Sequence, residues 1–309
     1  MIGIVNIANY ISEKKLFNLD KNKSMNIDKS FIDKIGIEIT ARKNKEEKAS
    51  DLCVKAYNEL LKKIDKENFN DIDLLVVCTQ NGDYQIPHTS AIVHSKLGFS
   101  NNVATFDISL GCSGYIYSLD IVKGFMLNNN YKNALIFTAD PYSDIIDDND
   151  KNTELLFGDA ATVTLLSCIN PVFEITNSLY STYGDKYFYL IKEKEKYLYM
   201  DGKGIFNFTL QNVPRNINDL LSICSYKEED IDMFIFHQAN KYMLESLIKR
   251  MKLDINKVPI AMNDYGNTVS SSIPIVLSNY INNYENNNIL LCGFGVGLSI
   301  SSCILRRII

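Results

Sequence analysis

The sequence predicts an α/β fold, and the pattern of apolar residues is the first observation that leads to it. The runs LLVVC, NALIFTA and ATVTLL contain few polar residues and do not alternate, which is typical of strands covered by helices on both faces. Stretches with apolar residues at helical spacing separate these runs. Strands that alternate with amphipathic helices favour a layered α/β architecture.

An internal repeat is the second observation. Three segments of the first half recur in the same order in the second half. The matched residues are Asp73 with Asp232, Gly111 with Gly266, and Asn128 with Asn283. Their separations of 159, 155 and 155 residues are nearly constant, which indicates a duplicated fold. We therefore expect two domains, 1–168 and 169–309.

The first half is expected to alternate helices and strands before ending in two strands. In order, these are helix 49–63, strand 74–79, helix 90–97, strand 104–108, helix 113–127, and strands 134–138 and 161–167. The second half is expected to repeat the series with helix 213–224, strand 233–237, helices 238–252 and 272–282, and strands 289–292 and 299–305. Segments 141–157 and 183–204 are polar and irregular, so we expect them to contact substrate.

Composition excludes several classes of protein. The chain has 309 residues, a formal net charge of −5 and 46% hydrophobic residues, as expected for a globular protein with a large core. The mildly acidic balance argues against nucleic-acid binding. No stretch approaches the roughly 18 apolar residues of a membrane span, and the first residues lack the pattern of a secretory signal. A cytoplasmic protein is the expectation.

Metal binding is not expected from the cysteines and histidines. Seven cysteines are scattered without a C-x-x-C pair, and only His88, His94 and His237 are available. Most of the cysteines are expected to be small buried apolar residues of a reduced protein.

Cys112 is the exception, because of its position. It follows the apolar run ATFDI and precedes a helical pattern in which Tyr115, Leu119, Val122 and Met126 share one face. The start of a helix offers unpaired N–H groups and the positive end of the helix dipole, which stabilise a thiolate. A nucleophile and a buried structural cysteine are equally good interpretations of position alone.

His237 and Asn267 are two further candidates. His237 ends the run MFIF and begins the tetrad HQAN, so it is expected at the carboxyl end of a strand, where α/β sheets place ligand groups. Asn267 precedes a helical pattern, and by itself it is interpreted as a helix cap. If the two halves pair about a pseudo-twofold axis, Cys112 and Asn267 occupy equivalent helix starts and face each other.

These motifs, taken together, resemble the thiolase-like condensing enzymes, most closely the β-ketoacyl-acyl carrier protein synthase III family. The resemblance covers nearly the whole chain. It rests on five stretches, DISLGCSGYIYSLDIV, FGDAATVTLLS, FHQANKYMLESLIKRM, NDYGNTVSSSIPIVL and CGFGVGLSISSCIL. The implied fold is thiolase-like, with two duplicated βαβαβαββ halves in an αβαβα arrangement of layers.

The resemblance implies a two-step reaction that needs no cofactor. Cys112 takes an acyl group from a thioester, and malonyl-acyl carrier protein then loses carbon dioxide and condenses with it to give a 3-oxoacyl product. His237 and Asn267 donate hydrogen bonds to the thioester oxygen during decarboxylation. The backbone N–H groups of Cys112 and Val296 form the oxyanion hole for acyl transfer, although the family has glycine at the position of Val296.

The resemblance also implies a homodimer and an acyl pocket. Phe294 matches a phenylalanine beside the nucleophile, and Ile86 matches a residue that caps the pocket from the partner subunit. Phe31 lies near a position where the family has the tryptophan that contacts coenzyme A. Lys34 and Glu38 lie at or near positions where the family often has arginine. This difference leaves open whether the acyl donor is acyl-CoA or acyl-acyl carrier protein.

A surface for the acyl carrier protein is the last expectation from the sequence. Its residues lie on the helix after His237 and are Lys241, Lys249, Arg250 and Lys252. A solvated helix face is an equally good interpretation. Three alternatives to fatty-acid initiation stay open: a specialised ketosynthase, an acyltransferase that passes the Cys112-bound acyl group to a sugar, amine or hydroxyl, and a binding-only subunit.

Overall fold

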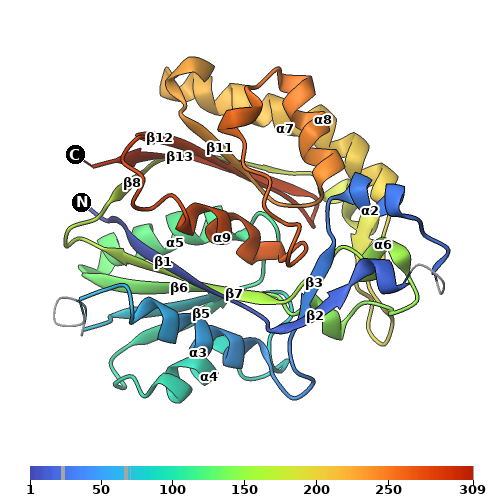
Figure 1. Cartoon of the computed structure of the whole chain (residues 1–309). Coiled ribbons are helices and arrows are strands. Elements are labelled where there is room, and N and C mark those ends of the chain that lie inside the picture. The colour runs from blue at the N-terminus through green and yellow to red at the C-terminus, as the bar shows by residue number, and fades with distance from the viewer. Residues whose placement is uncertain (22–24, 66–68, 70, 309) are drawn as a thin grey trace.

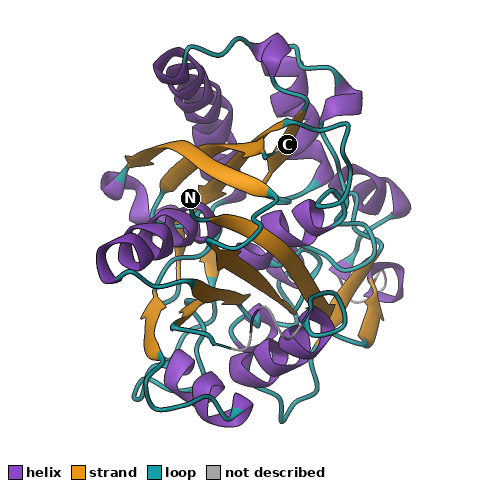
Figure 2. Ribbon diagram, turned by 90° about the vertical axis from the view of Figure 1, so that its left-hand side faces the viewer, coloured by secondary structure: helices purple, strands orange, loops and turns teal. Residues whose placement is uncertain are grey.

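Five layers make up the molecule (Figures 1 and 2). The computed structural model describes residues 1–21, 25–65, 69 and 71–308. Two helices, α5 and α9, lie between two parts of a sheet; α3 and α4 cover one outer face, and α7 and α8 cover the other. The helices are α2 (Lys29–Ile35), α3 (Ala49–Leu60), α4 (Thr89–Leu97), α5 (Gly114–Asn129), α6 (Lys151–Glu154), α7 (Gly202–Cys224), α8 (Lys241–Met251) and α9 (Ser272–Ser278).

One mixed sheet of nine strands runs through the molecule. Its strands are β1 (Gly3–Ile11), β4 (Leu74–Cys78), β5 (Ala104–Ile108), β6 (Asn133–Ala139), β7 (Ala160–Ser167), β8 (Phe173–Thr182), β11 (Met233–Phe236), β12 (Asn288–Gly295) and β13 (Ser299–Arg307). Their spatial order is β11-β12-β13-β8-β1-β7-β6-β4-β5. β1 and β8 pair only at their first residues, so the sheet separates there into two stacked parts.

Two smaller sheets lie outside these layers. They are formed by β2 (Lys14–Phe17) with β3 (Ile39–Arg42), and by β9 (Leu190–Ile191) with β10 (Tyr199–Met200).

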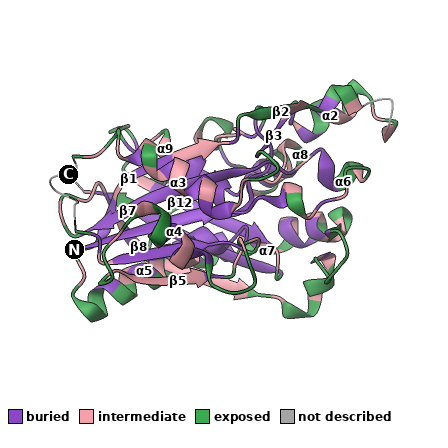
Figure 3. Ribbon diagram, turned by 90° about the horizontal axis from the view of Figure 1, so that it is seen from below, coloured by how far each residue is buried: buried purple, intermediate pink, exposed green. Residues whose placement is uncertain are grey.

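The strands are buried because helices cover both faces of each part of the sheet (Figure 3). Every residue of β4, β6 and β7 is buried, in agreement with their unbroken apolar runs. Helix α5 contacts β4 and β6 of the first half and β8, β12 and β13 of the second. It is therefore apolar around much of its circumference rather than on one stripe.

The duplication extends to individual hydrogen bonds. In the first half, Asp73 accepts hydrogen bonds from the backbone N–H groups of Lys132 and Asn133 at 2.7 and 3.0 Å. In the second half, Asp232 accepts the same bonds from residues 287 and 288 at 2.8 and 2.9 Å. Each carboxylate thus joins two parallel neighbouring strands, β4 with β6 and β11 with β12, in the same way.

The second half departs from the expected βαβαβαββ order. Among its described residues, no strand corresponds to β5. The segment at that place contains Pro259, which has no N–H to donate to a strand neighbour. The side-chain amide of Gln238 takes over this pairing, since it bonds to the Pro259 carbonyl at 3.3 Å and to the Ala261 N–H at 2.9 Å.

Helix boundaries also differ from the sequence expectation. The helix expected to begin at residue 213 begins at Gly202, where the Asp201 carboxylate accepts the Gly204 N–H, and Pro214 lies inside it. A proline usually marks the first turn of a helix, which explains why its earlier half was missed. Helix α8 begins at Lys241 rather than 238, because the Asn240 side chain caps it.

The first strand of each half, β1 and β8, was not located from the sequence, although both lie at the centre of the sheet. The predicted boundary between residues 168 and 169 falls in the connection between β7 and β8 and stays a prediction. In the part of the chain that is described, no helix is long and apolar enough to cross a membrane.

A buried ion pair joins β3 to the end of α6. Arg42 and Glu154 are both buried, and the Arg42 guanidinium lies 2.9 Å from the Glu154 carboxylate. Arg42 also donates hydrogen bonds to the backbone carbonyls of Glu154 and Phe157. Lys21 approaches the same carboxylate at 3.2 Å.

We expect Arg42→Met to lower the free energy of unfolding by about 3 kcal/mol, because it leaves a buried carboxylate short of a partner and two carbonyls without a donor. The exposed pair of Arg306 with Glu174 is the matched control. Arg306→Met is expected to have a much smaller effect, because an ion pair of an exposed side chain contributes little to stability. Urea unfolding of both variants measures the difference, and equal effects would contradict the structural role assigned to Arg42.

Candidate active site

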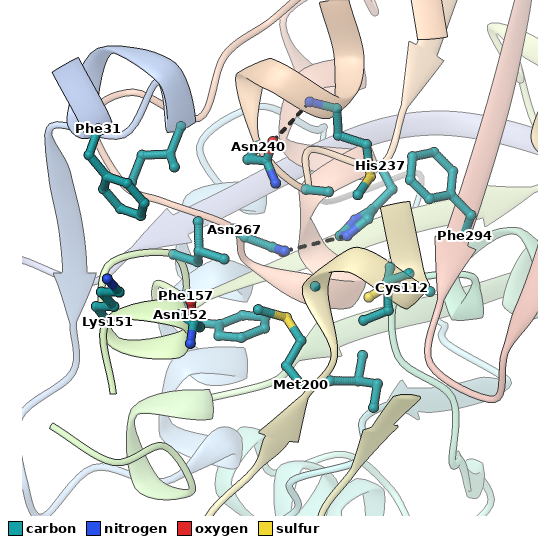
Figure 4. Close-up of a pocket in the computed structure, with 18 residues that line it drawn as sticks. Phe31, Cys112, Lys151, Asn152, Phe157, Met200, His237, Asn240, Asn267 and Phe294 are labelled. Atoms are coloured by element: carbon teal, nitrogen blue, oxygen red, sulfur yellow. Dashed lines mark hydrogen bonds between the residues drawn. The ribbon is translucent and has the colours of Figure 1, made fainter. Parts of the chain in front are cut away.

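A cavity of about 180 Å³ lies where the two halves meet (Figure 4). Its polar lining residues are Cys112, Lys151, Asn152, His237, Asn240 and Asn267. Its apolar lining includes Phe31, Phe157, Met200, Met243 and Phe294. The structure thus brings Cys112, His237 and Asn267, which are far apart in the sequence, to one cavity.

Cys112 lies in the tight connection between β5 and α5. Its backbone turns through a hydrogen bond from the Gly114 N–H to the Gly111 carbonyl at 2.8 Å. The thiol faces Gly295, where an added Cβ would lie only 2.9 Å from the Cys112 sulfur. Glycine at 295, which has a φ of +153°, is therefore required for the close approach of β12 to the thiol.

Burial raises the pKa of the Cys112 thiol to about 12, and the charge of Asp140 adds to this effect. Hydrogen bonds from the backbone N–H groups of Val296 and Cys112 itself lower that pKa, but they do not offset burial. The resting residue is therefore a thiol. The two N–H groups expected to form an oxyanion hole both point at the sulfur.

His237 follows β11 and is held by its own backbone, whose N–H donates to the Cys292 carbonyl at 2.8 Å. The ring packs edge-on against Phe294, with centroids 5.5 Å apart. Burial lowers the pKa of His237 to about 3, although the Val269 carbonyl acts in the opposite direction. The imidazole is therefore neutral at physiological pH, with one ring nitrogen as a donor and the other as an acceptor.

The backbone N–H and carbonyl of Asn267 are both hydrogen-bonded to the segment after α6. Its N–H donates to the Leu156 carbonyl at 2.7 Å, and its carbonyl accepts the Gly158 N–H at 2.9 Å. The side-chain oxygen accepts the Val269 N–H at 2.9 Å, which directs the side-chain nitrogen Nδ2 towards His237. Asn267 Nδ2 and His237 Nε2 lie 3.5 Å apart.

The remaining pocket predictions have different outcomes in the structure. Phe294 and Phe31 line the cavity, while Ile86 is 84% exposed on a loop and does not line it within one chain. Lys34 lies over the ring of Tyr242, with its nitrogen 4.4 Å from the ring centroid. Glu38 lies beside a separate groove between α2 and α8.

Helix α8 carries most of the predicted carrier-protein surface. Lys249, Arg250 and Lys252 are exposed, with Lys252 at the end of the helix. Lys241 is only half-buried, packs against Gly36 and lies 3.9 Å from Glu245. None of the ion pairs of the described residues includes Lys249, Arg250 or Lys252, whereas Lys241 lies near Glu245. Three of the four basic residues are therefore unpaired on the surface.

Several cavity residues were not named from the sequence. Lys151, Asn152 and Phe157 come from segment 141–157, and Leu190 and Met200 come from segment 183–204. Both segments were expected to contact substrate, but their irregular sequences gave no residue periodicity from which individual side chains could be chosen. Asn240 belongs to the HQAN tetrad, and its role as the cap of α8 accounts for its place at the cavity wall.

Comparison with known proteins identifies the family. Residues 106–184 match the family described as 3-oxoacyl-[acyl-carrier-protein] synthase III, and residues 221–307 match its C-terminal family. The chain is 31% identical to β-ketoacyl-[acyl-carrier-protein] synthase III of Neisseria gonorrhoeae, over 97% of each chain. The chain belongs to the β-ketoacyl-[acyl-carrier-protein] synthase III family.

Further members of the synthase III family agree with this assignment. The enzyme of that name from Caldanaerobacter subterraneus is 32% identical over 98% of this chain and 97% of its own. The crystal structure of 3-oxoacyl-(acyl-carrier protein) synthase from Burkholderia xenovorans superposes with a TM-score of 0.90 at 30% identity, covering 99% of this chain and 94% of that one. The predicted thiolase-like fold and a condensing enzyme of the transferase class are thereby confirmed. The family assignment does not favour the alternative of an acyltransferase that acts on a sugar, amine or hydroxyl.

We expect the rate at which iodoacetamide alkylates Cys112 to rise about tenfold per pH unit from pH 6 to pH 9, because the thiolate fraction grows in that proportion well below a pKa of about 12. Mass spectrometry of the Cys112 peptide follows the reaction, with Cys112→Ser to identify the adduct and the exposed Cys168 to show that the reagent is active. A plateau below pH 8 would show that the resting residue is a thiolate.

Proposed function

We propose that this chain condenses an acyl group held on Cys112 with the two-carbon unit of malonyl-acyl carrier protein. The observation that carries the proposal is the convergence of three groups on one cavity. The Cys112 thiol, His237 Nε2 and Asn267 Nδ2 line it together, and the two nitrogens are 3.5 Å apart. A pair of nitrogens at this spacing suits a single oxygen that gains negative charge between them.

In the first step, the Cys112 sulfur attacks the carbonyl carbon of an acyl thioester. A new carbon–sulfur bond forms, the bond to the carrier thiol breaks, and the cysteine proton leaves with that thiol. The backbone N–H groups of Cys112 and Val296 stabilise the tetrahedral oxyanion. Because the resting thiol is protonated, deprotonation has to accompany attack rather than precede it.

In the second step, the carboxylate of the malonyl thioester leaves as carbon dioxide and its electron pair forms an enolate. His237 and Asn267 donate hydrogen bonds to the enolate oxygen. The enolate carbon then attacks the acyl carbonyl, a carbon–carbon bond forms, and the bond to the Cys112 sulfur breaks. The cysteine thiolate takes up a proton from water, which replaces the one lost with the carrier thiol in the first step. The neutral state of His237 suits it to hydrogen bonding rather than to protonating the substrate.

Substrate delivery completes the proposal. The donor is acyl-CoA or acyl-acyl carrier protein, and the acidic carrier approaches the exposed Lys249, Arg250 and Lys252 of α8, where opposite charge accelerates encounter. The reaction uses no cofactor. We place it in the cytoplasm, in fatty-acid initiation or in a specialised acyl pathway.

A homodimer would complete the acyl pocket. Two features support it. β5 forms an open edge of the sheet, and the loop before α4, which contacts β5 at His88, carries Ile86 and Tyr84, which are 84% and 58% exposed. An exposed strand edge with apolar neighbours favours pairing with another chain. Ile86 of the partner subunit would then cap the pocket next to Cys112.

The test of the function is release of carbon dioxide from malonyl-acyl carrier protein, coupled to formation of a 3-oxoacyl product. Asn267→Ala and His237→Ala are each expected to lower condensation about 10²–10³-fold, because each removes one oxyanion donor. Acyl loading of Cys112, measured by intact-protein mass spectrometry, should survive in both variants. Cys112→Ser should abolish loading. Acyl transfer to a hydroxyl or amine without carbon dioxide release would refute the proposal.

The dimer is tested separately by varying its proposed contact. Ile86→Ala should allow Cys112 to be loaded with longer acyl chains from a panel of acyl-CoAs, because a smaller side chain leaves room at the pocket end. Ile121→Ala removes a partly exposed isoleucine from α5 and is the control. Sedimentation equilibrium that gives the mass of one chain, together with full condensing activity, would contradict the dimer.

A further inference from the structure

Three consecutive serines follow the candidate residue Asn267, and each binds a different part of the molecule. Ser270, Ser271 and Ser272 are all buried. Ser270 donates to the carboxylate of Asp140, and Ser271 lies 2.8 Å from the hydroxyl of Thr138, so both join α9 to the first half. The Ser272 hydroxyl instead lies 2.7 Å from His237 Nδ1. Neither step of the proposed condensation involves this last contact.

The contact matters because a neutral imidazole carries only one ring proton. If the proton is on Nε2, that nitrogen can donate into the cavity; if it is on Nδ1, Nε2 presents only a lone pair. The arrangement proposed for decarboxylation needs the first state. The side chain that faces Nδ1 must therefore not accept a hydrogen bond from it, and should preferably donate a hydrogen bond to it.

The surroundings of Ser272 favour donation from the hydroxyl to Nδ1. Its oxygen already accepts the Gln238 N–H at 3.4 Å, and its side chain is fully buried. Among the described residues, His237 Nδ1 is the acceptor within hydrogen-bond distance of this hydroxyl. If Nδ1 carried the proton, the hydroxyl proton would be buried without a partner, at a cost of about 1–3 kcal/mol.

On the opposite side of the ring, the contact with Asn267 is too long to decide the proton position. Since the Asn267 oxygen accepts the Val269 N–H, its NH₂ group must face His237 Nε2. The separation of 3.5 Å exceeds the ordinary length of an N–H hydrogen bond, so little is lost if Nε2 is itself a donor. Two donors then face one point of the cavity, where a substrate oxygen can accept both.

The turn that carries Ser272 is held firmly. Val269 has a φ of +54°, which is a rare conformation for a β-branched residue. Such a conformation persists only where neighbouring contacts determine it. The Asp140 carboxylate supplies them, because it accepts Ser270 on one side and the Gln80 N–H, at 2.7 Å, on the other.

We propose that Ser272 is a positioning residue that fixes His237 with its proton on Nε2, so that His237 and Asn267 act as a pair of donors. Ser272 does not touch the substrate and acts only through the imidazole. The inference rests on the proposed function for its catalytic consequence, but the position of the ring proton can be measured independently of any activity.

Nitrogen NMR of histidine-labelled protein tests the proposal directly. The chain has only three histidines, and His237→Ala identifies the signals of His237. In the wild type we expect the shift of a protonated Nε2 and an unprotonated Nδ1. Ser272→Ala should give a mixture of both states, and Ser272→Thr, which keeps the hydroxyl, should restore the wild-type spectrum.

Kinetics of the same variants separate positioning from a general loss of structure. Ser272→Ala should lower malonyl decarboxylation about 10–100-fold while acyl loading of Cys112 changes less than twofold, as expected when only the orientation of a catalytic histidine is lost. Ser278→Ala, which removes a hydroxyl bonded to Asn9 at the other end of α9, is the control and should affect neither step.

Each outcome decides between the two claims. A wild-type His237 protonated on Nδ1 would overturn the role of Ser272 and leave the condensing function intact, even if Ser272→Ala did not fold. An unchanged proton position in Ser272→Ala would also overturn it. The expected proton position without carbon dioxide release would instead support the role of Ser272 and refute the proposed function.

Discussion

The hydrogen bonds that join the starts of α5 and α9 to the opposite half of the molecule are the constraint on which the site depends. Both helices begin between the two stacked parts of the sheet, so the polar groups at their first turns have no access to bulk water and need protein partners. Ser113, before α5, bonds to Ser299 of β13 at 2.7 Å. Ser270 and Ser271, before α9, bond to Asp140 and Thr138 at the end of β6.

These hydrogen bonds between the halves hold Cys112 and Asn267 opposite each other. Cys112 lies beside Ser113, and Asn267 lies three residues before Ser270. Both serines are bonded to the other half, so neither helix can shift along its axis without breaking buried hydrogen bonds. The cost of an unpaired buried polar group makes such shifts unfavourable. The internal duplication therefore brings two equivalent helix starts to one cavity, where they carry different side chains.

Burial also determines the chemical state of the site. It keeps the Cys112 thiol protonated and His237 neutral, because a charge on either would be poorly solvated. Hydrogen bonds to a developing oxyanion are stronger in such an environment than in water. A neutral histidine can act as a donor only if its proton is on the correct nitrogen, which is why the hydroxyl of Ser272 matters.

Sequence alone was enough to predict the layered α/β class, the repeat, the meeting of Cys112, His237 and Asn267 at one cavity, and the position of strands such as Ala104–Ile108. Local apolar pattern and motif spacing are properties of the chain itself. Tertiary structure alone decided the rest. Four features depend on partners more than 20 residues away or on the opposite half. They are the central strands β1 and β8, the Gln238 side chain in place of a strand, the contact of Ser272 with His237, and the cavity residues of the irregular segments. Such contacts are set by how buried groups find hydrogen-bond partners in three dimensions, and local sequence carries no record of that choice.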